Sequence, residues 1–126
     1  MKQIINTPLA PSPIGPYSQA VLVNNMLYTS GQIAINPATN ELVLETIEAE
    51  THRVMQNLQE VLKAAEMTFE NVVKSTIFIT DMNQFAQINS VYAQYFDENT
   101  APARETVQVS CLPKKVNIEI SMIAIK

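Results

Sequence analysis

The sequence is poor in glycine, cysteine and histidine, and each shortage excludes a class of site. Only two of the 126 residues are glycines, Gly15 and Gly31, so neither a three-glycine dinucleotide loop nor a phosphate-binding P-loop is present. A single cysteine, Cys111, and a single histidine, His52, cannot form a Cys/His zinc cluster or a disulfide framework. The sequence therefore predicts no metal site and no cofactor, and its chemistry must rest on carboxylates, arginine, tyrosine, hydroxyl groups or the backbone.

Positive charge and long apolar runs are also scarce. Twelve acidic residues against eight basic ones give a net charge of −4 at pH 7, the wrong sign for tracking a phosphate backbone. Apolar runs such as Met122 to Ile125 are far shorter than the roughly 20 residues that span a bilayer. The N-terminus lacks the apolar stretch of a secretory signal, and a lone cysteine suits a reducing compartment. We therefore expect a cytoplasmic protein with no nucleic-acid partner and no membrane partner.

Apolar residues make up 47% of the chain and follow strand and helix patterns. They recur at helical spacing from about Thr46 to Ala65, and a second stripe, from Phe85 to Phe96, follows a cap-like start at Asp81. The predicted strands are 20–23, 26–30, 72–80, 103–110 and 116–125, with Asn24-Asn25 as a tight turn and a short N-terminal strand in addition. This order predicts one α+β domain over residues 1–126 with both helices on one sheet face. The other face is apolar, and we expect another subunit to cover it.

The five residues from Cys111 to Lys115 are a hairpin-sized connection between the last two predicted strands. In that register Glu119 faces Gln108 and Arg104 faces Ile123, which separates Arg104 from Glu119 by roughly 13 Å along the ladder. One small ligand and one water do not bridge that distance. We therefore expect each site to take its arginine and its glutamate from two different subunits.

Two residues on these strands suit chemistry. Arg104 shares a strand face with Thr106, and a planar guanidinium beside a hydroxyl suits the carboxylate of a small organic acid; the alternative is an arginine paired with a surface acid. Glu119, between Ile118 and Ile120, suits a general base that activates water; the alternative is a solvated charge on an edge strand. The remaining candidates are interpreted as an exposed histidine (His52), a buried inert thiol (Cys111), and core packing by the tyrosines and phenylalanines of the second helix.

Seven ordered motifs resemble the Rid family, also called the YjgF family, over nearly the whole chain. They are Gly15-Pro16-Tyr17-Ser18-Gln19-Ala20, Ser30-Gly31-Gln32-Ile33, Asn71-Val72-Val73-Lys74, Asp81-Met82, Asn89-x-x-Tyr92, Pro102-Ala103-Arg104 and Leu112-Pro113-Lys114. Because of the arginine in Pro-Ala-Arg, the chain resembles the RidA-type subgroup of this family. The resemblance implies a chorismate-mutase-like fold and a homotrimer with sites between subunits. It also implies hydrolysis of 2-iminobutanoate and 2-iminopropanoate to 2-keto acids and ammonia without a cofactor.

The resemblance also assigns roles to individual residues. It implies that Arg104 binds the substrate carboxylate, that Glu119 handles water, and that Tyr17 acts in the catalytic cleft. Ser30, Gly31, Asn89 and Thr106 match substrate-binding positions, although many members have cysteine where Thr106 stands. Glu45, Glu66 and Lys115 occupy positions where relatives often carry glycine. If a turn there is left-handed, the residue costs roughly 1 to 2 kcal/mol.

Two other functions are alternatives to imine hydrolysis. A non-catalytic metabolite-binding module would need Arg104 but not a second, repelling carboxylate at Glu119. A ribonuclease or translation inhibitor, an activity attributed to some relatives, is disfavoured by the acidic charge balance and by the lack of a basic aromatic surface. Hydrolysis of an imine is the leading hypothesis because a protonated imine is already electrophilic and needs only orientation and an activated water.

Overall fold

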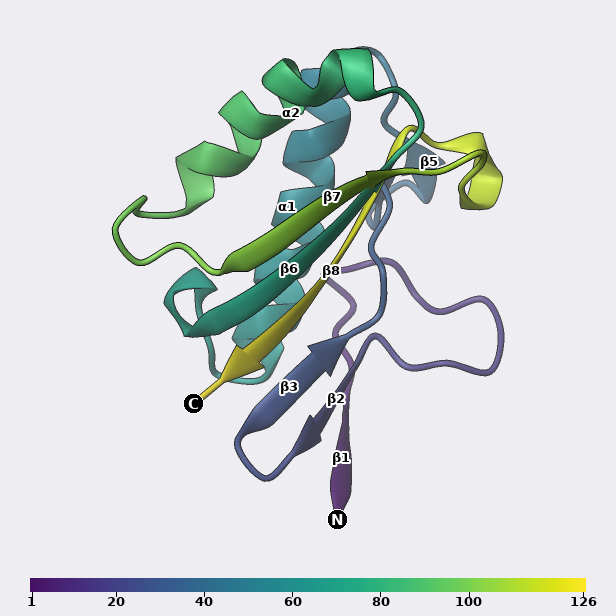
Figure 1. The fold of residues 1–126 in the computed structure, drawn as a ribbon. Coiled ribbons are helices and arrows are strands. Elements are labelled where there is room, and N and C mark those ends of the chain that lie inside the picture. Colours follow the sequence, from purple (N-terminus) through teal and green to yellow (C-terminus); the bar gives the residue numbers. More distant parts are fainter.

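Two helices cover one face of a six-stranded sheet in the computed structural model, which describes residues 1–126 (Figure 1). The large sheet has the order β1-β2-β3-β8-β6-β7, and only β6 and β7 run parallel. Its strands are β1 (Lys2–Ile5), β2 (Ala20–Val23), β3 (Met26–Thr29), β6 (Val72–Ile79), β7 (Ala103–Gln108) and β8 (Ile118–Ile125). The helices are α1 (Ile47–Ala64) and α2 (Phe85–Tyr92), and β4 (Ile35–Asn36) pairs with β5 (Glu41–Leu42) in a separate ribbon. The predicted α+β class, mixed sheet and one-sided helix layer are confirmed.

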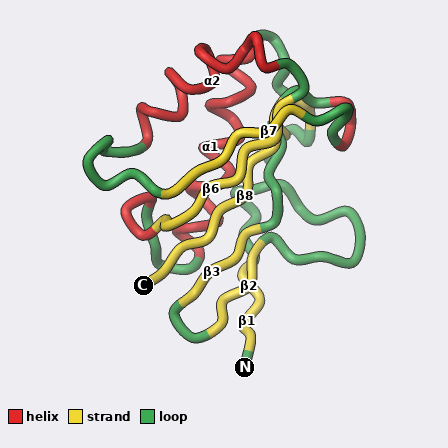
Figure 2. Tube along the Cα trace, in the orientation of Figure 1, coloured by secondary structure: helices red, strands yellow, loops and turns green.

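Local signals in the sequence account for several element ends. The β2–β3 hairpin closes on two residues, with Val23 opposite Met26 and Asn24 at φ 55°, because asparagine tolerates a left-handed backbone. Helix α1 begins where the Oγ1 of Thr46 accepts a hydrogen bond from the N–H of Ala49 at 3.0 Å. Short 3-10 turns flank α2, at Met82–Gln84 and Ala93–Tyr95 (Figure 2). The predicted first helix and hairpin are therefore confirmed to within a residue or two.

The predicted hairpin between the last two strands is wrong. Strand β7 pairs in parallel with β6, and β8 lies on the other side of β6, so Arg104 is opposite Ser75 and Glu119 is opposite Phe78. The reason is the β6-α2-β7 crossover, which returns the chain to the same end of the sheet and adds β7 beside β6. The segment after β7 then crosses the end of β6 and enters the sheet between β6 and β3.

Alternation along the strands separates a buried face from an exposed one. In β8, Ile118, Ile120, Met122 and Ala124 are buried, as part of a single core cluster that also includes α1 and α2. The face turned away from the helices leaves large apolar side chains exposed. These are Ile4, Tyr28, Val107 and Ile125. The expectation that the second face is apolar is confirmed; what covers it is part of the proposal below.

The C-terminus of α1 tests the expectation about glycine positions. Glu66 has φ 60° and Lys115 has φ 57°, so both are left-handed, whereas Glu45 is not. At Glu66, the N–H of Met67 donates to Leu62 O and the N–H of Glu66 donates to Lys63 O, the pattern of a Schellman motif. Glycine is the residue that this position favours because it has no Cβ to crowd the backbone.

We predict that Glu66→Gly stabilises the protein by about 1 kcal/mol, measured as the free energy of unfolding in urea. Glu66→Ala is the control, because it removes the same exposed carboxylate and keeps the strained Cβ. A gain with alanine equal to that with glycine would show that the carboxylate, and not the backbone, carries the cost.

Candidate functional site

Arg104 is held against α2 without a carboxylate partner. Its Nη1 donates to Oδ1 of Asn89 at 2.7 Å, and its guanidinium carbon lies 5.1 Å from the ring centroid of Tyr92 and 5.6 Å from that of Phe85. The three ion pairs of the chain involve lysines, so the guanidinium charge is not neutralised by an acid. The alternative of an arginine paired with a surface acid is therefore wrong. A cation oriented by an amide and two aromatic rings is free to receive an anion.

A second unpaired group lies on the same strand face. Thr106 follows Arg104 by two residues, and its Oγ1 is the one buried side-chain polar atom without a hydrogen-bond partner. A buried hydroxyl without a partner costs free energy unless something bonds to it. A cleft of about 610 Å³ lined by Asn89, Tyr92 and Arg104 opens beside this strand. Arg104, Thr106 and Asn89 form what we call the arginine half-site.

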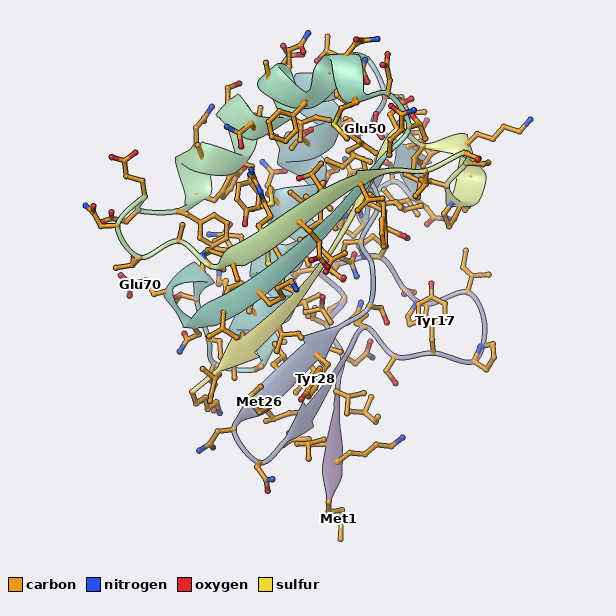
Figure 3. The ribbon with its side chains drawn as sticks, in the orientation of Figure 1. Met1, Tyr17, Met26, Tyr28, Glu50 and Glu70 are labelled. Carbon is orange, nitrogen blue, oxygen red and sulfur yellow. The ribbon has the colours of Figure 1, made fainter.

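Glu119 lies in a different cleft. A cavity of about 590 Å³ is lined by Glu119, Tyr17, Ser30, Gly31 and Lys114, together with Pro11, Ser12 and Ile14 of the loop between β1 and β2. Figure 3 labels Tyr17 on that loop, which extends away from the sheet. Burial raises the pKa of the Glu119 carboxyl above its usual value, because a desolvated carboxylate is penalised. Glu119, Tyr17, Ser30 and Gly31 form the glutamate half-site.

Backbone contacts hold the glutamate half-site together. The Oγ of Ser30 donates to the carbonyl of Ser18, and the N–H of Ser30 donates to the carbonyl of Gln19, which ties the residue that follows β3 to the segment after Tyr17. Gln32 forms an antiparallel bridge with Ile120, which places Gly31 directly against the Glu119 side chain. The hydroxyl of Tyr17 accepts the N–H of Ile14 at 3.3 Å, within an exposed loop.

Gly31 fits because it has no side chain. A Cβ at this position would lie 2.7 Å from Cδ of Glu119, and the three atoms nearest to it all belong to the Glu119 side chain. We predict that Gly31→Ala destabilises the wild-type protein by about 1 to 3 kcal/mol and displaces the carboxylate. The measurement is a double-mutant cycle in urea, because Gly31→Ala in a Glu119→Ala background adds the same methyl group where no carboxylate stands. An equal cost in both backgrounds would mean that Glu119 is not what the methyl group displaces.

The two half-sites lie on opposite faces of the sheet. Ser75, opposite Arg104, accepts a hydrogen bond from the Tyr92 hydroxyl of α2 and so faces the helices, whereas Phe78, opposite Glu119, is three residues further along β6 and faces away. Two strand spacings and three residues of rise place the two Cα atoms about 14 Å apart. Arg104 and Glu119 of one chain therefore cannot hold one small ligand between them. The conclusion that the two residues are too far apart in one chain therefore still follows, although the hairpin register from which the sequence predicts it is wrong.

Two interpretations of other residues are wrong, and the third, core packing by the aromatic residues of the second helix, is confirmed. Cys111 is exposed, not buried, because the segment after β7 crosses the sheet end instead of closing a hairpin. His52 is half-buried and its Nδ1 lies 2.8 Å from the Tyr95 hydroxyl, so it is not simply a solvated histidine. Phe85 and Tyr92 do pack against neighbouring groups, but both also flank Arg104. No sequence pattern predicts the contact of Arg104 with Phe85 and Tyr92, because that contact depends on how α2 packs against β7.

The remaining features concern metals and membranes. No group of three or more His, Cys, Asp or Glu side chains is placed to hold a metal ion. No helix is long and apolar enough to cross a membrane. The groups that the two half-sites present are a guanidinium without an acidic partner at Arg104 and a half-buried carboxyl of raised pKa at Glu119.

The chain is similar in sequence and in structure to several known proteins. A family model described as endoribonuclease L-PSP matches residues 7–126. The human protein named 2-iminobutanoate/2-iminopropanoate deaminase is 45% identical over 126 residues, which is 100% of this chain and 91% of the human one. A Yersinia pestis protein of the Rid family, YyfA, has a structure that superposes with a TM-score of 0.97 at 50% identity, covering 100% of both chains. The structure of TdcF from E. coli with bound serine superposes with a TM-score of 0.93 at 43% identity, covering 98% of both chains.

Proposed function

This chain belongs to the endoribonuclease L-PSP family, which includes the Rid proteins, and from that premise we propose that it is a cytoplasmic deaminase that hydrolyses 2-imino acids. The substrates would be 2-iminobutanoate and 2-iminopropanoate, and the products 2-keto acids and ammonia. The observation that carries the proposal is an arginine without an acidic partner on one face and a half-buried glutamate on the other. The name of the human relative supports the same reaction.

We propose that the enzyme is a homotrimer of the chorismate-mutase-like type, in which each site joins the arginine half-site of one subunit to the glutamate half-site of its neighbour. The exposed apolar sheet face supports an assembly, because large apolar patches are usually covered. The opposite placement of Arg104 and Glu119 supports a shared site, because one chain alone offers only half of the required groups at each cleft. In a closed ring every subunit supplies both halves.

In this mechanism Arg104 and the Thr106 hydroxyl hold the substrate carboxylate, and Asn89 keeps the guanidinium in place. Glu119 takes a proton from water as the water oxygen bonds to C2 of the protonated imine. Glu119 then returns that proton to the amino nitrogen of the carbinolamine. Ammonia leaves with the C–N electron pair as the Glu119 carboxylate takes the hydroxyl proton and the carbonyl forms.

The other residues of the glutamate half-site shape the cleft. Tyr17 stands on the loop at its edge and would close over the ligand or donate to it. Ser30 and Gly31 would form the wall on which the imine lies, with Gly31 leaving the space that the Glu119 carboxylate occupies. A pure metabolite-binding module would use Arg104 in the same way, but it gives no reason for a desolvated carboxylate beside an anionic ligand.

The test is a coupled assay. A pyridoxal-phosphate-dependent threonine dehydratase supplies the imine, and semicarbazide traps whatever is not hydrolysed. We expect the trapped product to fall as the amount of this protein rises. If it stays constant at every concentration while calorimetry detects 2-ketobutyrate binding that Arg104→Ala abolishes, the protein is a binding module. Cleavage of RNA that depends on Glu119, without imine hydrolysis, would favour a ribonuclease.

A further inference from the structure

Glu50 is a charged residue in the first turn of α1, on the buried face of the helix. Its side chain is 0% exposed, and none of the ion pairs of the chain involves it. Burying a carboxylate is costly unless donors compensate it, and an apolar side chain of similar volume is often the more stable choice. Global stability alone therefore gives a weak reason for a glutamate at this position.

The donors that compensate Glu50 all belong to the two residues before Glu119. Its Oε2 accepts the N–H of Asn117 at 2.8 Å and the N–H of Ile118 at 3.2 Å, and its Oε1 accepts the side-chain Nδ2 of Asn117 at 2.8 Å. Figure 3 shows Glu50 at the end of the sheet where β8 begins. One carboxylate thus fixes the entry of the chain into β8.

The segment that carries Glu119 is held on both sides. The carbonyl of Asn117 accepts the N–H of Thr80 at 3.1 Å, and Ile120 exchanges two backbone hydrogen bonds with Gln32. Between these anchors the Glu119 side chain lies directly against Gly31, so closely that a Cβ on Gly31 would overlap it. A shift of the β8 start would therefore move the Glu119 carboxylate relative to Gly31 within the cleft.

We propose that Glu50 is a positioning residue that sets the placement of the Glu119 carboxylate through Asn117 and Ile118. This inference rests on the proposed function, since it assigns Glu50 a role in that reaction. Glu50 acts on the glutamate half-site alone, because none of its hydrogen bonds reaches β7 or α2. Its loss should lower kcat and leave KM, which reflects carboxylate binding at Arg104, nearly unchanged.

The test exchanges the two hydrogen-bonding groups. In Glu50→Gln the new amide can still accept the backbone N–H groups, but its NH₂ then faces the Nδ2 of Asn117, donor against donor. In Asn117→Asp two carboxylates face each other. The double variant Glu50→Gln/Asn117→Asp restores one donor and one acceptor at this contact. We expect each single variant to lower kcat by about 10- to 100-fold and the double variant to recover most of it.

Thr51→Val is the matched control. Thr51 is the next residue of α1, is also 0% exposed, and donates a buried hydrogen bond to Ile47 O at 2.7 Å, so it tests loss of helix stability at a side chain whose hydrogen bond stays within α1. We expect it to lower the unfolding temperature and leave kcat unchanged. If Glu50→Gln does not fold, Asn117→Ala, which removes only the side-chain donor, should show a smaller fall in kcat at constant KM.

The outcomes separate the two proposals. A wild-type protein that hydrolyses imine, with single variants as fast as wild type or a double variant slower than both, overturns the role of Glu50 and leaves the proposed function standing. A fall in kcat in Thr51→Val equal to that in Glu50→Gln has the same meaning, because stability alone would then explain it. A wild-type protein that hydrolyses no imine overturns both.

Discussion

Replacing Arg104 with lysine is expected to lower kcat/KM for imine hydrolysis by about 100-fold, although the positive charge is kept. A guanidinium presents two parallel N–H donors to a carboxylate, whereas an ammonium acts as a point charge. Lysine also loses the stacking between Phe85 and Tyr92 and the fixed bond to Asn89 that orient Arg104. Loss of one charge-assisted hydrogen bond and of this orientation amounts to about 3 kcal/mol, which corresponds to that factor.

The matched control for this result is Arg53→Lys. Arg53 is the only other arginine, and its guanidinium also binds an amide oxygen, that of Asn57, at 2.8 and 3.1 Å. It lies on α1, outside both half-sites, so the same substitution there should leave kcat/KM near the wild-type value. Near-normal turnover by Arg104→Lys would remove Arg104 from the substrate-binding role.

Glu119→Gln is expected to reduce kcat by about 100-fold or more while 2-keto acid binding persists. The amide keeps the shape and hydrogen-bonding capacity of the side chain but cannot take a proton, and general base catalysis typically contributes about 10²- to 10⁴-fold. The Arg104 half-site is untouched, so calorimetry should detect 2-ketobutyrate with an affinity close to wild type. Wild-type turnover by this variant would leave Glu119 without a catalytic role.

The raised pKa of Glu119 adds a pH dependence to the same comparison. The base works as a carboxylate, so wild-type kcat/KM should fall as pH decreases through a pKa above the usual glutamate value, and the residual activity of Glu119→Gln should lack that fall.

The free energy of unfolding should change with pH in the opposite sense. The folded state binds more protons than the unfolded state in this window, so wild type loses stability as pH rises through it, and Glu119→Gln does not. The variant should therefore be at least as stable as wild type at pH 7 in urea titrations.

The sequence predicts local structure well where a single element decides it. The cap at Thr46 and the turn at Asn24 depend on residues close in sequence, and both are found in the structure. The predicted position of β7 in the sheet is wrong because that position depends on how α2 crosses over the sheet. The short spacing between β7 and β8 in the sequence does not reveal this crossover. Adjacent strands in sequence are not always neighbours in a sheet.

The candidate site also combines features that the local sequence predicts with features that depend on tertiary packing. Arg104 and Glu119 were found from strand alternation and chemical type, but their placement on opposite faces required the register of β6. The contacts that orient these side chains come from residues distant in the sequence, as in the contact between Arg104 and Tyr92. Glu50 carried a visible signal, since it stands between Ile47 and Val54 on an apolar helical stripe, where a charge requires a partner.

The central claim is that one site takes Arg104 and Glu119 from two chains, and subunit mixing tests it most directly. Arg104→Ala and Glu119→Ala proteins, each inactive alone, are dissociated together, reassembled, and assayed after mass spectrometry confirms exchange. Random mixing of equal amounts gives each interface one intact arginine and one intact glutamate about a quarter of the time, so activity should rise to about a quarter of wild type. Activity that stays at the level of the parents after confirmed exchange would contradict the shared site.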